Sequence, residues 1–155
     1  SDWDGMILAS AGIERLGMVN EITHHIPIED MLPAPGQGAL AIEAREDDLE
    51  IAKLINPMEN RQAYLSSSTE REILHSLGGG CQLPLGTFVR KDGEEYLIDA
   101  CIAYPNVKGL MRTQKRYSES DMVKTAQLID SAFLSNGQSE MISNLTDAER
   151  KEKSH

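Results

Sequence analysis

The sequence predicts an α+β domain from about residue 58 onward, in which helices cover one face of a small antiparallel sheet. Apolar residues recur at helical spacing between residues 61 and 76. Three strand-like segments follow, and an Asp-Gly turn joins the first two of them. An amphipathic segment at residues 120–137 then predicts a second helix. A helix, a three-stranded meander and another helix together make one small α+β unit.

Residues 1–57 predict elements that lack neighbours. The apolar run at residues 6–9 predicts a buried strand, followed by a short helix or turn that ends at Gly17. Residues 19–38, with three prolines, predict an extended crossover loop. Residues 39–44 predict another strand, and residues 47–57 predict a helix that Pro57 ends. Because a lone strand cannot satisfy its backbone groups, these strands indicate that the chain is part of something larger.

The elements after residue 58 have clear start and stop signals. The helix expected at residues 61–76 ends at a triple glycine, a residue type that readily adopts the left-handed conformation. Strands are expected at residues 83–91, 94–105 and 109–118, with the first turn at residues 91–94. The second helix, at residues 120–137, ends at Asn-Gly, and the charged tail beyond it is expected to fray.

Composition narrows the class of protein. The 155 residues carry a formal net charge of −10, which argues against a protein that coats nucleic acid, since phosphate binding needs a basic face. Two cysteines are too few for a disulfide framework. No signal peptide is expected, because the first residues lack a basic start, and no apolar run is long enough to span a bilayer. These features predict a cytoplasmic protein that is not membrane-bound.

One cysteine stands in unusual surroundings. In "LGGGCQLPLG", residues 77–86, three glycines precede Cys81. A reactive thiol must be reachable, and glycines remove side-chain bulk around it and allow the loop to move. The alternative is that the glycines only end a helix and that Cys81 is a small buried packing residue, as free cysteines often are. Cys101, by contrast, is expected in the middle of a strand, as part of the core.

Three longer motifs favour a reactive thiol over a buried packing residue. "DGMILASAGIERLG" at residues 4–17, "MLPAPGQGALAIEAREDD" at 31–48 and "STEREILHSLGGGCQLPLGTF" at 68–88 together resemble the C-terminal half of porphobilinogen deaminase, also called hydroxymethylbilane synthase. The resemblance implies a three-domain enzyme. Residues 1–57 would supply the end of domain 2, the crossover and a returning piece of domain 1, both of them periplasmic-binding-protein-like α/β domains. Residues 58–155 would form the cofactor-carrying C-terminal domain.

The resemblance also implies an activity. The family, a transferase of haem and related tetrapyrrole biosynthesis, condenses four porphobilinogen molecules into hydroxymethylbilane and releases ammonia from each. Its primer is a dipyrromethane cofactor, attached through a thioether to the cysteine that is Cys81 here. Gly79 and Gly80 would keep the attachment point open for the growing polypyrrole.

Further residues take their expected roles from the same resemblance. Arg15 matches an arginine that binds the carboxylates of cofactor and substrate, which guanidinium forks suit. Gln37 lies in a glycine loop beside the cleft. Arg45 and Arg71 rank lower, and Arg71 with Glu70 is expected to hold hinge or interdomain contacts. No catalytic residue is expected in this chain, because the family's catalytic aspartate belongs to the N-terminal half, and no metal is expected.

These points lead to one main hypothesis and two alternatives. The chain is expected to be an inactive fragment whose partners are porphobilinogen and the missing N-terminal half, within a parent enzyme that is a monomer. One alternative is a non-catalytic binding or regulatory module that retains the cysteine domain. The other is a self-associating module, because unpaired strands and apolar patches favour such contacts.

Overall fold

The computed structural model describes residues 3–78, 83–103 and 110–122. The chain divides into two compact units, residues 1–31 and residues 32–155, which are considered separately below. This division differs from the expected domain boundary between residues 57 and 58, which stays a prediction. None of the described helices is long and apolar enough to cross a membrane.

The first unit contains the helix α1 (Ser10–Arg15) and the short 3-10 helix η1 (Val19–Glu21). The expected short helix is confirmed, and Gly17 follows it at φ +70°, where its N–H donates to Glu14 O. The buried strand predicted for residues 6–9 is wrong, since this segment has no strand pairing and its large side chains, Met6, Ile7 and Leu8, are exposed. Apolar character alone cannot make a strand without a neighbouring strand to receive its hydrogen bonds.

The second strand prediction, for residues 39–44, is wrong for the same reason. This segment of the second unit is unpaired, and Leu40 is 76% exposed. The helix predicted beside it is confirmed as α2 (Leu49–Ile55), continued by the 3-10 helix η2 (Asn56–Met58). Asp48 caps α2 by accepting a hydrogen bond from the N–H of Ile51 at 3.1 Å.

The helix α3 (Arg61–Ser76) has the predicted bounds. Asn60 caps its N-terminus by accepting a hydrogen bond from the N–H of Ala63 at 3.0 Å. Leu77 follows the last turn, and Gly78 takes the left-handed conformation at φ +68°, as expected of a glycine that ends a helix.

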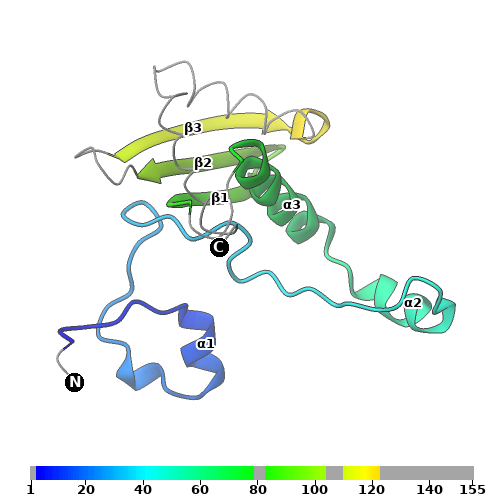
Figure 1. Ribbon diagram of the computed structural model, residues 1–155, viewed down its shortest axis with the longest axis horizontal. Coiled ribbons are helices and arrows are strands. Elements are labelled where there is room, and N and C mark those ends of the chain that lie inside the picture. The colour runs from blue at the N-terminus through cyan, green and yellow to red at the C-terminus, as the bar shows by residue number, and fades with distance from the viewer. Residues whose placement is uncertain (1–2, 79–82, 104–109, 123–155) are drawn as a thin grey trace, which may run out of the picture. The chain divides into compact units, whose positions relative to one another are not determined.

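The three predicted strands form one antiparallel sheet in the order β1-β2-β3, and Figure 1 shows them side by side. Their bounds are β1 (Leu85–Asp92), β2 (Glu95–Ala103) and β3 (Leu110–Ser118). Asp92 pairs with Glu95, so the hairpin loop is Gly93 and Glu94, with Gly93 at φ +67°. A glycine with positive φ at the first loop position fits a type II′ turn, which suits the right-handed twist of the strands.

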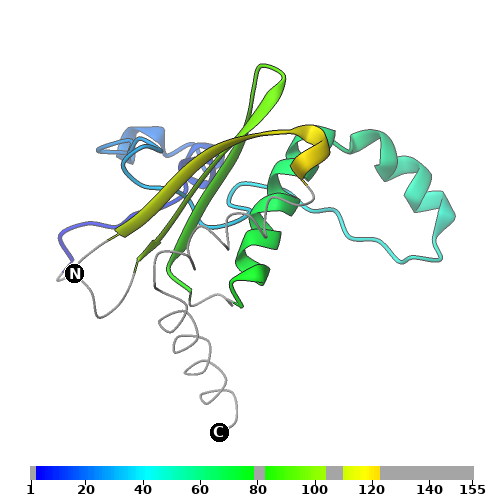
Figure 2. The ribbon, with the colours of Figure 1, turned by 90° about the horizontal axis from the view of Figure 1, so that it is seen from above.

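The core lies between α3 and one face of the sheet. Figure 2 shows α3 lying along that face. Alternate residues of β2 enter this core, and Ile98 and Ile102 meet Ile73 and Leu77 of α3 there. The α+β class, with a three-stranded antiparallel sheet and a helix on one face, is therefore confirmed. Met122, where the second helix was expected to begin, is also buried in this core, while residues 123–137 of that prediction lie outside the described residues.

The other face of the sheet receives the chain where it enters the second unit. Leu32 is buried against Gly86 of β1, where an added Cβ would lie 2.8 Å from Leu32 Cβ and 3.0 Å from Cys101 Sγ. The N–H of Thr87 donates to the carbonyl of Pro33 at 2.9 Å. A glycine at position 86 thus lets the incoming segment approach β1 closely.

Candidate functional site

Cys81, Gly79 and Gly80 lie outside the described residues, but both sides of their segment are described. On the N-terminal side, Leu77 is buried in the core at the end of α3. On the C-terminal side, Leu83 is buried in the same core, just before β1. The segment that carries Cys81 therefore begins and ends close to anchored core residues.

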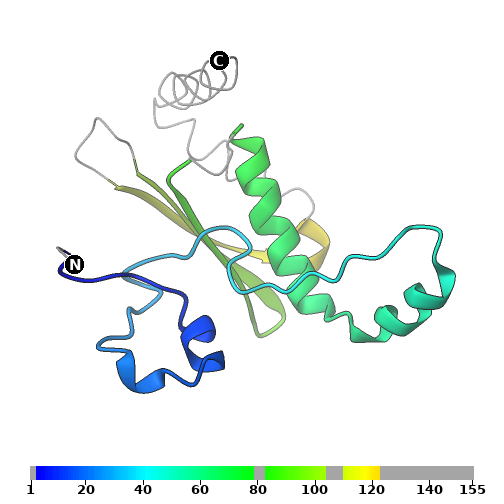
Figure 3. The ribbon, with the colours of Figure 1, turned by 60° about the horizontal axis from the view of Figure 1, so that its bottom comes forward.

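Gln37 lies in a loop that is fastened to this same unit. The carbonyl of Pro33 accepts a hydrogen bond from β1, and the N–H of Gly36 donates to Glu70 Oε2 of α3 at 2.8 Å. Figure 3 shows the segment that contains this loop passing beside β1 and α3. The loop exposes the side chain of Gln37, between Gly36 at φ +75° and Gly38 at φ +81°. A side chain presented in this way is available to a ligand.

Arg71 lies on α3 next to the same loop. A Cβ added at Gly36 would be 4.0 Å from Arg71 Cγ, and the arginine is exposed at the edge of a shallow hollow that Ser68 and His75 also line. The structure thus brings the Gln37 loop and the Arg71 helix together. The expected hinge role of Arg71 stays a prediction.

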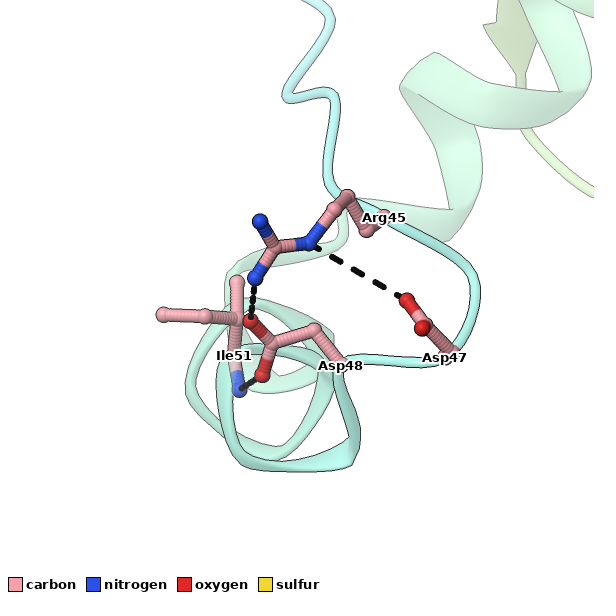
Figure 4. Close-up of polar contacts among 4 residues, drawn as sticks. All are labelled: Arg45, Asp47, Asp48 and Ile51. Carbon is pink, nitrogen blue, oxygen red and sulfur yellow. Dashed lines mark hydrogen bonds and ion pairs between the residues drawn. The ribbon is translucent and has the colours of Figure 1, made fainter.

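Arg45 is engaged with acidic neighbours. Its Nη2 lies 3.2 Å from Asp48 Oδ2 and its Nε lies 4.0 Å from Asp47 Oδ1, as Figure 4 shows. The arginine side chain is 80% exposed, so each contact contributes at most about 1 kcal/mol to stability. An anion that binds the guanidinium more strongly could therefore displace either aspartate. In this structure its guanidinium supports the start of α2.

Arg15 belongs to the first unit, at the end of α1, and its side chain is exposed. The loop of Gln37 and the flanks of Cys81 belong to the second unit. Its carboxylate-binding role stays a prediction.

Glu70 makes structural contacts that the sequence did not predict. It is 6% exposed, and its two carboxylate oxygens accept the N–H groups of Gly36 and Val89, both at 2.8 Å. Burial raises the pKa of Glu70 above its ordinary value, while the two backbone hydrogen bonds oppose that rise. The sequence could have indicated that Glu70 is buried, because Glu70, Ile73 and Leu77 lie on the same stripe of the helix, which faces the core.

A second buried carboxylate lies on the face of the sheet opposite α3. Asp99 accepts two hydrogen bonds from Arg112, at 2.8 and 2.7 Å, and one from Gln114 at 3.0 Å. The Arg112 hydrogen bonds hold the pKa of Asp99 below its ordinary value, against the opposing effect of burial. Cys101, next to this pair, is half-buried, and burial raises the pKa of its thiol. We interpret the doubly hydrogen-bonded pair of Asp99 and Arg112 as structural.

Replacing Asp99 with asparagine is expected to lower the free energy of unfolding by about 2 kcal/mol near neutral pH. Because its pKa is lowered by folding, the stabilisation is complete above the ordinary value of 3.8 and is lost as pH falls below it. Urea unfolding of wild type and Asp99→Asn between about pH 7 and pH 2.5 measures the difference, which should shrink at the acidic end.

The half-exposed ion pair of Asp92 with Arg116 on the same face provides the control. Asp92→Asn is expected to cost less than about 1 kcal/mol. A loss in Asp99→Asn that stays constant with pH would contradict the assignment of the effect to the ionised carboxylate.

The described residues contain no group of three or more histidine, cysteine, aspartate or glutamate side chains that could hold a metal ion.

Comparison with known proteins identifies two family domains in the chain. Residues 1–53 match the family described as "Porphobilinogen deaminase, dipyromethane cofactor binding domain", and residues 64–133 match "Porphobilinogen deaminase, C-terminal domain". Dipyrromethane is therefore the cofactor of the family that this chain resembles.

Curated proteins of similar sequence are named porphobilinogen deaminase. The porphobilinogen deaminase of Syntrophomonas wolfei is 41% identical over 66% of this chain and 33% of its own length. That of Oceanobacillus iheyensis is 39% identical over 76% of this chain and 38% of its own length. That of Acidithiobacillus ferrooxidans is 34% identical over 94% of this chain and 47% of its own length. The chain thus spans between a third and a half of these relatives, and it belongs to the porphobilinogen deaminase family.

Proposed function

We propose that this chain acts as part of an enzyme that condenses four porphobilinogen molecules into hydroxymethylbilane, with release of ammonia, in tetrapyrrole biosynthesis. The observation that carries the proposal is the order of the two family domains along one chain, with the cofactor-binding domain before the C-terminal domain. The match to the Acidithiobacillus ferrooxidans relative supports it, because that match runs through both domains.

Cys81 is the proposed attachment point of the dipyrromethane cofactor. Its sulfur would bond to the methylene carbon of a porphobilinogen as the carbon–nitrogen bond breaks, and the thiol proton would leave with the amine as ammonia. A second porphobilinogen would add to the free α-carbon of this pyrrole, with the ring hydrogen and the amine leaving as a second ammonia, and the resulting dipyrromethane would serve as the primer for chain growth. The anchored flanks Leu77 and Leu83 would hold the attachment point near α3, while Gly79 and Gly80 leave room around it.

The exposed polar side chains are proposed to bind the carboxylates of cofactor and substrate. Arg15 and Gln37 are the main candidates, because both side chains are exposed and Gln37 stands on a loop fixed to α3. Arg45 and Arg71 are secondary candidates. A guanidinium stays charged and pairs with a carboxylate through two hydrogen bonds, which suits a substrate that bears acetate and propionate groups.

The exposed apolar residues support the proposal that this chain packs against another protein segment. Large side chains are solvent-exposed in residues 6–8, 40–42 and 49–54, where soluble domains rarely expose apolar residues so densely. We propose that these segments pack against the part of the enzyme that the relatives possess beyond the matched region, within a monomeric cytoplasmic enzyme whose surroundings keep Cys81 reduced.

Size-exclusion chromatography of the isolated chain tests the self-associating alternative, which a clean monomer would contradict.

A chimera tests the proposed function directly. It joins the part of the Acidithiobacillus ferrooxidans relative that this chain does not match to this chain. With porphobilinogen, the chimera is expected to release ammonia and to carry a dipyrromethane adduct on Cys81, detected by intact mass and peptide mapping. The isolated chain is expected to show neither. A chimera that melts as cooperatively as the relative, yet leaves Cys81 bare and releases no ammonia, would contradict the proposal.

A further inference from the structure

The carboxylate of Glu70 joins three separate parts of the second unit. Oε2 accepts the N–H of Gly36, 34 residues away, and Oε1 accepts the N–H of Val89 in β1, 19 residues away. Both distances are 2.8 Å, and the residue is 6% exposed. Each oxygen therefore serves one backbone donor, in a site with little access to water.

A packing role alone does not explain a glutamate at this position. Glu70 lies on the helix stripe of Ile73 and Leu77, where an apolar side chain would add to the core without the cost of burying a carboxylate. Its two hydrogen bonds recover part of that cost, and both go to backbone groups outside its own helix. The carboxylate thus contributes less to core packing than an apolar side chain would, but its hydrogen bonds connect the loop to the sheet.

The Gly36 contact fixes the loop at its most adaptable point. Leu32 and Pro33 already hold the start of the segment against β1. Beyond them, Gly36 and Gly38 adopt positive φ, and glycine samples many other conformations at small cost. A hydrogen bond at Gly36 therefore favours one conformation for the glycine that precedes Gln37.

We propose that Glu70 is a positioning residue, which holds the loop of Gln37 on the helix that leads to Cys81. α3 ends at Ser76, five positions before Cys81, so Glu70 fastens the loop of Gln37 to the helix that precedes the proposed attachment segment. This inference rests on the proposed function for the roles of Gln37 and Cys81. The link between Glu70 and Gly36 stands on the structure alone.

Amide hydrogen exchange on the intact chain tests the link. Glutamine keeps the size of Glu70 but replaces one acceptor oxygen by an NH₂ group, which cannot accept the second backbone N–H. In Glu70→Gln the amide of Gly36 or Val89 is expected to exchange about ten to a hundred times faster, whereas the Ile73 amide should not change. The matched control is Glu72→Gln, an exposed glutamate of the same helix. Unchanged exchange of both amides in Glu70→Gln and Glu70→Ala would overturn the inference.

Activity of the chimera tests the positioning role. Glu70→Gln is expected to reduce the rate of adduct formation on Cys81 by about tenfold, and Glu70→Asp, which retains two acceptor oxygens, should restore part of it. If Glu70 acts through Gln37, the double variant Glu70→Gln/Gln37→Ala should lose no more than the more impaired single variant. Losses that multiply would overturn the positioning role. An unmodified chimera without adduct would refute the proposed function, while the exchange experiment would still decide the link.

Discussion

Replacing Cys81 by serine is expected to abolish the dipyrromethane adduct and all turnover in the chimera. A thiolate is the attacking group in thioether formation, and a serine hydroxyl, which hardly ionises at neutral pH, cannot replace it without a dedicated base. Intact mass spectrometry after exposure to porphobilinogen measures the adduct, and ammonia release measures the turnover. The loss should be complete rather than partial, because no primer is then attached.

The same chain supplies the matched control in Cys101. This half-buried cysteine lies in β2, and burial raises the pKa of its thiol, which keeps it in the less reactive protonated form. Cys101→Ser should therefore retain both adduct and turnover. A peptide map that places the adduct on Cys101, or an adduct that survives in Cys81→Ser, would contradict the assignment of Cys81.

Replacing Ile73 by alanine is expected to lower the free energy of unfolding by about 2–5 kcal/mol. Ile73 is fully buried in the cluster that joins α3 to the sheet, so the truncation removes apolar contacts and leaves a cavity. Urea denaturation of the isolated chain, followed by far-ultraviolet circular dichroism, measures the change in midpoint at constant slope.

Ile42→Ala provides the control for this truncation. It deletes the same atoms from a side chain that is 54% exposed, and it should change the stability of the isolated chain by less than about 0.5 kcal/mol. Equal losses in the two variants would show that α3 is not docked through Ile73. In the chimera, by contrast, we expect Ile42→Ala to be costly, because Ile42 would there pack against the partner segment.

Elements with local signals could be predicted from the sequence. α3 begins after the cap Asn60 and ends at the glycines, and both signals lie within a few residues of the helix ends they determine. The Gly93 turn similarly sets the pairing of β1 with β2. The strands expected at residues 6–9 and 39–44 failed because a strand depends on a partner, which the local sequence does not specify.

The candidate site shows the same contrast. The motif around Cys81 could be recognised in the sequence because its residues are contiguous. The bond between Glu70 and Gly36 joins residues 34 positions apart, and although a hinge or interdomain role was expected for Glu70, the sequence did not indicate Gly36 as its partner. For Arg45, the sequence shows the neighbouring acidic residues Asp47 and Asp48. Only the structure shows that both of them contact its guanidinium group.

The order of the strands has a consequence for the speed of folding. Each strand of the sheet pairs with its neighbour in the sequence, so the paired residues are close in the chain, and hairpins of this kind form within about 1–10 microseconds. The contact between Gly36 and Glu70 closes a longer loop of chain and gains little until α3 and β1 are in place. We therefore expect the sheet to form early and the loop of Gln37 to dock last, onto a surface that already exists.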